Sequence, residues 1–243
     1  MSHIHLRSVM LLLLITLLSS SEALAQSSSE RDRIMKEIES LQEQVKAKEK
    51  VLLAPAREDA APYEDFLNQP GTGLIRLLPR EKYDGKLLIR GGGAYYSFAS
   101  LKHEYGQGSD IELQQNSFSV GFAGADFGYL CLLGEVPLQE VGLDHAGAQF
   151  LLNYAAPSAE PEARQAAMRA RTDFQANNYV YKDRLPVQVG STYLLRSISY
   201  GDSDTLVAFR VLRKDSDGSV ILLWKMLKKF PKPQLQRDKT AKM

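Results

Sequence analysis

Short apolar segments, broken at regular intervals by turn residues, dominate the chain from residue 63 onward. Gly, Pro, Asn and Asp residues separate them every 8 to 12 positions, a spacing typical of all-β domains. The segments of strand length in the first half of this region are 74–78, 86–90, 94–100, 111–115, 118–123 and 127–133. We therefore predict a mainly β domain over residues 63–230, built as a sandwich or barrel of antiparallel sheets.

The C-terminal part shows this pattern most clearly, in the three consecutive segments 193–200, 205–213 and 219–230. The sequences GDSD and DSDG separate these segments, and both are rich in residues that hairpin turns select. One face of the last segment carries Val220, Leu222, Trp224 and Met226, and the other carries Ile221, Leu223, Lys225 and Leu227. Because both faces are largely apolar, we predict a three-stranded meander whose last strand is an inner strand.

One helix is expected within the β-rich domain, over residues 158–175. Acidic residues lie near its start, and Arg164, Arg169 and Arg171 follow later. This order of charges complements the helix dipole, which favours acids at the N-terminus and bases toward the C-terminus.

The N-terminus has the layout of a secretory signal peptide, which we predict over residues 1–25. A short polar stretch ending at Arg7 precedes an apolar run at 9–18, and Ala-Leu-Ala follows at 23–25. The apolar run would span about 15 Å as a helix, roughly half the hydrocarbon core of a bilayer. We expect cleavage before Gln26 and export to the periplasm or the medium; the alternative is an uncleaved membrane anchor.

Residues 26–53 are predicted to form an amphipathic helix of the coiled-coil type. Apolar residues follow a heptad spacing, with a lysine at the one remaining position: Ile34, Ile38, Leu41, Val45, Lys48 and Leu52. This stripe either joins copies of the chain into a homo-oligomer or packs on the chain's own β-rich domain. We favour the homo-oligomer, because residues 54–62 (APAREDAAP) have the composition of an extended linker.

Overall charge gives no reason to expect a nucleic-acid partner. The chain has 30 Lys and Arg against 29 Asp and Glu, and 44% of its residues are hydrophobic, as in soluble globular proteins. This neutrality conceals a basic end, since residues 225–243 contain seven basic residues and one acid. The basic tail at 231–243 is therefore a candidate for weak contact with a membrane surface or an acidic partner.

A single cysteine, Cys131, limits the covalent and metal chemistry of the chain. It excludes an internal disulfide and a zinc site built from cysteines. Because its neighbours are Leu130 and Leu132, we expect a buried thiol that packs as a small apolar side chain.

Histidine and carboxylate residues provide the few candidates for catalysis. His103, Glu104, Asp110 and His145 have the chemistry to move protons or bind a metal, but no H-E-x-x-H spacing or serine-nucleophile motif accompanies them. We therefore assign no metal or cofactor, and keep His103, Glu104 and His145 as weak catalytic candidates.

Aromatic residues gather near two glycine-rich segments and suggest a binding surface. Tyr95, Tyr96 and Tyr105, with Asp110 and Asp126, could form a site for a sugar or a peptide. The alternative is ordinary packing of aromatic side chains between strands.

These observations favour an exported, non-enzymatic binding protein with a β-rich domain and a possible oligomerising helix. One alternative is a small secreted hydrolase or metal-dependent enzyme that uses His103, Glu104, Asp110 and His145. Another is an envelope-associated factor that contacts anionic surfaces through its basic tail.

Overall fold

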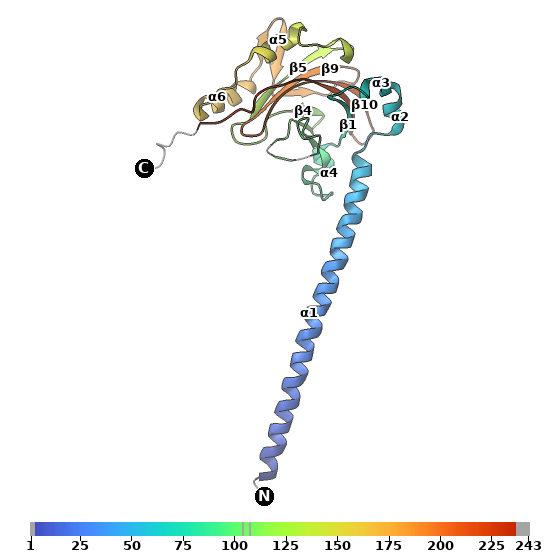
Figure 1. Ribbon diagram of the computed structural model, residues 1–243, viewed down its shortest axis with the longest axis vertical. Helices are drawn as coiled ribbons and strands as arrows, with labels where there is room; N and C mark the ends of the chain where they lie inside the picture. The colour runs from blue at the N-terminus through green and yellow to red at the C-terminus, as the bar shows by residue number, and fades with distance from the viewer. Residues whose placement is uncertain (1–2, 104, 107, 237–243) are drawn as a thin grey trace, which may run out of the picture. The chain divides into compact units, whose positions relative to one another are not determined.

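The computed structural model describes the backbone of residues 3–103, 105–106 and 108–236, and the side chains of these residues from position 28 onward. The chain divides into two compact units, residues 1–48 and 49–243. A long helix, α1 (His3–Leu53), runs through the first unit into the start of the second, and the remaining elements follow it (Figure 1). The helix predicted over 26–53 is the C-terminal half of α1, whereas the side chains of the predicted signal peptide lie outside the described residues.

The second unit is built from two antiparallel sheets, which confirms the predicted mainly β fold with an N-terminal helix. The larger sheet has the order β1-β11-β10-β9-β5-β7-β6, and the smaller has the order β2-β3-β4-β8. Strands of the larger sheet are β1 (Thr72–Leu77), β5 (Phe127–Gly134), β6 (Phe174–Ala176), β7 (Tyr179–Lys182), β9 (Thr192–Ser199), β10 (Ser203–Lys214) and β11 (Val220–Lys229). Strands of the smaller sheet are β2 (Tyr95–Tyr96), β3 (Ile111–Gln114), β4 (Ser117–Ser119) and β8 (Arg184–Pro186).

Short helices connect or cover these sheets. They are α2 (Arg57–Ala60), η1 (Ala61–Tyr63), α3 (Glu64–Leu67), α4 (Arg80–Tyr83), η2 (Arg90–Gly93), η3 (Leu138–Glu140), α5 (Ala146–Asn153) and α6 (Glu160–Ala170). Within the described side chains, no helix combines the length and the apolar character that crossing a membrane requires.

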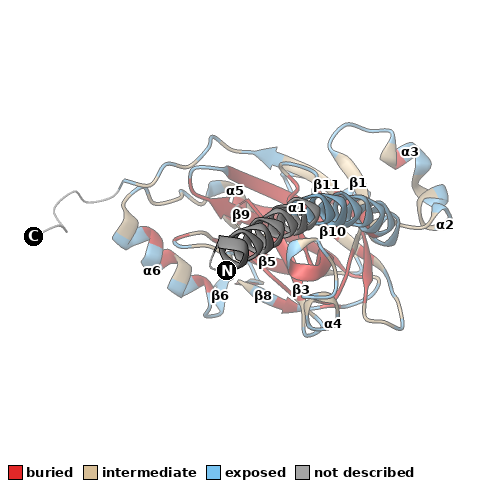
Figure 2. Ribbon diagram, turned by 90° about the horizontal axis from the view of Figure 1, so that it is seen from below, coloured by how far each residue is buried: buried red, intermediate tan, exposed pale blue. Residues whose placement is uncertain are grey.

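The central strands of the larger sheet are buried on both faces. One face packs against the smaller sheet, where the centre of the Phe118 ring lies 5.2 Å from that of Phe209 and 5.5 Å from that of Tyr193. The opposite face packs against α5 and α6 through Leu151, Ala163 and other small apolar residues. The second unit therefore has three layers (Figure 1), and its buried residues concentrate in the central strands (Figure 2).

The C-terminal meander is confirmed, and so is the prediction of its two faces. β11 lies between β1 and β10, and Val220, Leu222 and Trp224 contribute to the core between the sheets. Leu223 and Leu227 contribute to the core beneath the helices. The observed strands differ from the predicted segments by one or two residues at their ends.

Edge strand β1 depends on a glycine that faces an aromatic ring. Gly73 pairs directly with Trp224 on β11, and a Cβ atom at Gly73 would lie 2.6 Å from the indole nitrogen. Only glycine leaves room for the indole to lie over this part of the edge strand.

The strand predicted over 86–90 is wrong, because these residues form turns that lead into η2. The carboxylate of buried Glu49 accepts hydrogen bonds from the backbone N–H groups of Leu88 and Ile89. These amides are therefore occupied by a residue that lies 39 positions earlier than Leu88 in the sequence. After this turn, Gly91, Gly92 and Gly93 all adopt positive φ.

The structure differs from the sequence predictions in its helical parts as well. The helix predicted over 158–175 is shorter, as α6, and a second helix, α5, was not predicted. Residues 54–62, predicted as an extended linker, contain α2 and part of η1, and Asp59 forms an ion pair with Arg213. The first half of the predicted basic tail also contacts the β-rich domain, since the backbone N–H of Gln236 donates a hydrogen bond of 2.7 Å to the Ser158 carbonyl.

A buried ion pair joins β9 to β10 on the helix-covered face. The Arg196 guanidinium donates two hydrogen bonds to the Asp204 carboxylate, at 2.9 and 2.8 Å, and both side chains are almost fully buried. Arg196 also donates to the Tyr154 carbonyl at 2.6 Å and lies 3.8 Å from the centre of the Phe230 ring. One cation therefore connects two strands, the end of α5 and the chain beyond β11.

We predict that Asp204→Asn lowers the unfolding free energy by about 3 kcal/mol, because it leaves the Arg196 charge buried without a counter-ion. Urea denaturation followed by the fluorescence of Trp224, the chain's single tryptophan, measures this loss. Asp173→Asn is the matched control, since Asp173 pairs with Lys182 at the surface; it should cost less than about 1 kcal/mol. Equal losses in the two variants would contradict the prediction.

Candidate functional site

The predicted ligand-binding tyrosines lie around a buried carboxylate, Glu112 on β3. Glu112 accepts hydrogen bonds from the hydroxyls of Tyr95 (2.6 Å) and Ser119 (2.9 Å), and forms an ion pair with Arg80 at 3.0 Å. Burial, followed by the hydrogen bond to Glu112, raises the pKa of Tyr95 far above its ordinary value. Tyr95 is therefore a neutral hydroxyl donor that fixes β2 to β3.

Tyr105 forms the partly accessible edge of this cluster. Its ring packs edge-on against Tyr95, with 4.8 Å between ring centres. The guanidinium of Arg90 lies 4.6 Å from the centre of the Tyr105 ring, and that of Arg80 lies 6.0 Å from it. Two cations thus contact one aromatic ring, an arrangement that stabilises the loop before β3.

Tyr96 and His103 pack together beneath this cluster. Their ring centres are 5.2 Å apart, and Tyr96 is equally close to Phe98 in the core between the sheets. The His103 Nδ1 atom lies 3.1 Å from the Tyr95 carbonyl oxygen. Burial lowers the pKa of His103 to about 4, although the Tyr95 and Gly93 carbonyls favour the protonated ring. The imidazole is therefore neutral at physiological pH.

Asp110 is fully buried and holds the loop that begins after β2. Its carboxylate accepts hydrogen bonds from the backbone N–H groups of Phe98 (2.6 Å) and Ala99 (3.4 Å), and from the Thr205 hydroxyl (3.3 Å). Burial raises the pKa of Asp110 to about 6 despite these donors and a further one from Ser197.

Asp126 plays a similar part at the start of β5. It accepts hydrogen bonds from the Ser199 hydroxyl at 3.0 Å and from the backbone N–H of Tyr200 at 2.9 Å. Partial burial raises its pKa. Asp126 thereby fastens the turn between β9 and β10.

The predicted catalytic residues share no contact that the structure describes. His145 caps α5 by accepting a hydrogen bond from the Gly147 backbone N–H at 3.1 Å, and its ring faces Tyr179. His103 instead contacts β2, and Glu104 lies outside the described residues. Among the described side chains, no group of three or more His, Cys, Asp or Glu has the arrangement to hold a metal ion.

Cys131 is fully buried, as the sequence predicted. Burial raises the pKa of its thiol to about 12, so the reactive thiolate is absent at physiological pH.

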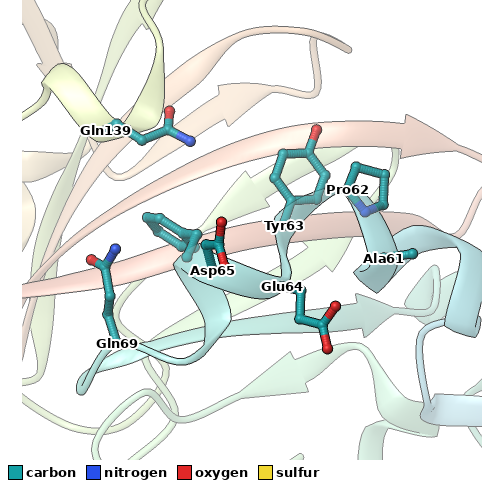
Figure 3. A pocket seen from close by; sticks show the side chains of 8 residues that line it. Ala61, Pro62, Tyr63, Glu64, Asp65, Gln69 and Gln139 are labelled. Carbon is teal, nitrogen blue, oxygen red and sulfur yellow. The ribbon is translucent and has the colours of Figure 1, made fainter.

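A shallow pocket of about 400 Å³ lies beside α3 (Figure 3). Tyr63, Phe66 and Asp65 line it from one side, and Gln69 and Gln139 contribute carboxamide groups. Its lining combines exposed acids with aromatic rings, and it contains none of the residues predicted from the sequence to bind a ligand.

An exposed apolar stripe on α1 is the other surface with functional character. Its members are 38 to 52% exposed, and they are the five apolar residues of the predicted heptad: Ile34, Ile38, Leu41, Val45 and Leu52. Among the described residues, this is the longest regular series of exposed large apolar side chains.

Comparisons of the chain with protein-family models, with curated proteins and with solved structures give no significant match. Its function must therefore be inferred from its own residues.

Sequence patterns did not identify Glu112, Arg80 and Arg90 as partners of the tyrosines. A signal for Glu112 was present, because it is a single acid between Ile111 and Leu113 in a short strand. Arg80 and Arg90 carry no such signal, since Arg80 reaches Tyr105 from α4 and Arg90 follows the turn that Glu49 fixes.

We predict that the stability contributed by His103 falls as pH decreases. Below pH 6.5 the unfolded chain binds a proton at His103, whereas the folded chain resists protonation until about pH 4. Relative to His103→Asn, the unaltered chain should therefore lose about 2 kcal/mol of unfolding free energy between pH 7 and pH 5.

Urea denaturation of both proteins at the two pH values measures this difference. The raised pKa of Asp110 has the opposite effect, stabilising the fold as pH falls, but it is common to both proteins and cancels. Parallel pH profiles for the two proteins would refute the neutral, buried assignment of His103.

Proposed function

We propose that this chain is an exported, non-enzymatic binding protein that self-associates through α1. The observation that carries the proposal is the exposed heptad stripe at Ile34, Ile38, Leu41, Val45 and Leu52. Export rests on the signal-peptide layout of residues 1–25, which remains a prediction.

Burial of the stripe against a second copy would recover hydrophobic free energy. A fully buried Ile, Leu or Val side chain contributes about 1.5–3 kcal/mol relative to its exposed state. A heptad spacing brings such residues of two helices into one continuous seam. The second copy is the occupant that matches this spacing residue for residue.

Lys48 limits the strength of that association. It occupies the seam position between Val45 and Leu52, and its side chain is exposed. A charged residue in a coiled-coil seam lowers stability, and a helix of about three heptads is marginal by itself. We therefore propose a concentration-dependent homo-oligomer rather than a permanent one.

The residues of the β-rich domain support a binding role better than a catalytic one. Asp110, Asp126 and Glu112 accept hydrogen bonds that hold loops and strands together, and His103 is neutral and packed against Tyr96. An acid–base catalyst needs a group that is free to exchange protons with a substrate. Contact of the basic tail with an anionic surface stays a separate prediction.

We predict that Val45→Lys weakens self-association at least about tenfold, because it places a second charge in the seam. Lys48→Leu should strengthen self-association by a similar factor, because it completes the apolar stripe. Light scattering and sedimentation across a range of protein concentrations measure both effects.

Lys46→Leu is the matched control, because Lys46 lies outside the seam and pairs with Glu43 on the same helix. It should leave association within about twofold of the unaltered chain. A monomer at all concentrations, or equal effects of Lys48→Leu and Lys46→Leu, would overturn the proposal.

A further inference from the structure

An open pocket of about 470 Å³ lies between α5 and the turn that joins β6 to β7. Its volume falls within the range of small-molecule sites, about 300–1,000 Å³. The residues that give it chemical character are Gln149, Phe150, Asn153, Tyr154, Ala176 and Asn177.

Two aromatic rings, those of Phe150 and Tyr154, line the pocket and are held firmly. Their ring centres are 5.6 Å apart. Tyr181 lies 4.7 Å from Phe150, and Tyr129 lies 5.4 Å from Tyr154, so both rings are supported from the core side. Phe174, which is 43% exposed, extends this aromatic surface beyond Phe150. Such rings form a preorganised apolar platform.

Two carboxamide groups are oriented by hydrogen bonds within and beside α5. The Gln149 side-chain NH₂ donates to the Leu143 carbonyl at 2.8 Å, and the Asn153 NH₂ donates to the Gln149 carbonyl at 2.9 Å. These bonds direct the nitrogen atoms toward the backbone of α5 and of the segment before it. Within the described part of the chain, neither amide oxygen accepts a hydrogen bond, so both remain acceptors for a ligand.

The lining contains no Asp, Glu, Lys, Arg or His side chain. A charged ligand would therefore lose hydration in this pocket without gaining a counter-ion. A purely apolar ligand would cover the carboxamide groups without bonding to them, which is also unfavourable. The composition fits a ligand that has both apolar faces and hydroxyl donors.

We propose that this pocket binds a neutral saccharide. The C–H faces of sugar rings pack on Phe150 and Tyr154, and sugar hydroxyls donate to the oxygens of Gln149 and Asn153. Asn177, which has positive φ at the β6–β7 turn, contributes a third carboxamide at the rim. This site is separate from the α1 stripe, so the proposal does not depend on self-association.

Binding of defined oligosaccharides to the full chain tests the proposal. The probes are the neutral hexamers of glucose in α1,4, β1,4 and β1,3 linkage and of N-acetylglucosamine, with anionic oligogalacturonate and cationic oligoglucosamine for comparison. We expect saturable calorimetric binding of at least one neutral probe, at least about tenfold tighter than either charged probe.

The Gln149→Ala/Asn153→Ala double variant should weaken that binding at least about tenfold, because it removes both oriented acceptors. Gln69→Ala/Gln139→Ala is the matched control, since it removes two carboxamides from the pocket in Figure 3. The control and the seam variant Val45→Lys should leave saccharide binding unchanged. Thermal unfolding curves check that each variant is folded.

Three outcomes would overturn the proposal. The first is the absence of binding to every neutral probe, and the second is equal binding of neutral and charged probes. The third is unchanged affinity in the folded Gln149→Ala/Asn153→Ala variant. Loss of self-association in Val45→Lys with saccharide binding intact would leave the pocket assignment supported, so the two proposals fail independently.

Discussion

Burial of the central strands of the larger sheet on both faces is the constraint on which the rest of the structure depends. Strands β9, β10 and β11 have apolar residues on each side, facing the smaller sheet on one side and the helices on the other. A polar group within these strands has little access to water and needs a partner inside the protein. Arg196 and Asp204 satisfy each other, and Ser197 and Thr205 satisfy Asp110 from the opposite face.

This constraint explains why the buried and partly buried carboxylates of the β-rich domain stabilise the fold. Glu112, Asp110 and Asp126 each tie a loop or a short strand to a neighbouring element. The four-stranded sheet has strands of only two to four residues, so backbone pairing alone gives it little stability. Its carboxylates and tyrosines supply the missing connections. The two binding surfaces that we propose, the α1 stripe and the pocket beside α5, lie outside this network.

Local patterns predicted the parts of the fold that local physics determines. The alternation in β11 correctly assigned each face, because a strand packed on both sides must be apolar on both. The segment at 86–90 failed for the opposite reason, since a distant carboxylate, Glu49, binds its backbone amides. The pairing of Arg90 with Tyr105 and the convergence of α5 on the β6–β7 turn also depend on tertiary contacts. The spacing of residues in the sequence does not predict these contacts.

The proposed self-association and the proposed saccharide pocket would reinforce each other in binding a polymer. In the proposed homo-oligomer, a seam of about three heptads interrupted by Lys48 would give marginal pairing, and an open, uncharged pocket would lack the ionic contacts that strengthen small-ligand binding. Two pockets carried on one paired molecule would bind a repeating polysaccharide with far higher avidity than either pocket alone, provided that both reach the same polymer. A repeating ligand would in turn favour pairing of the helices, because binding and association are thermodynamically linked. The proposed surfaces therefore fit one mechanism, in which a polymer gathers copies of the chain.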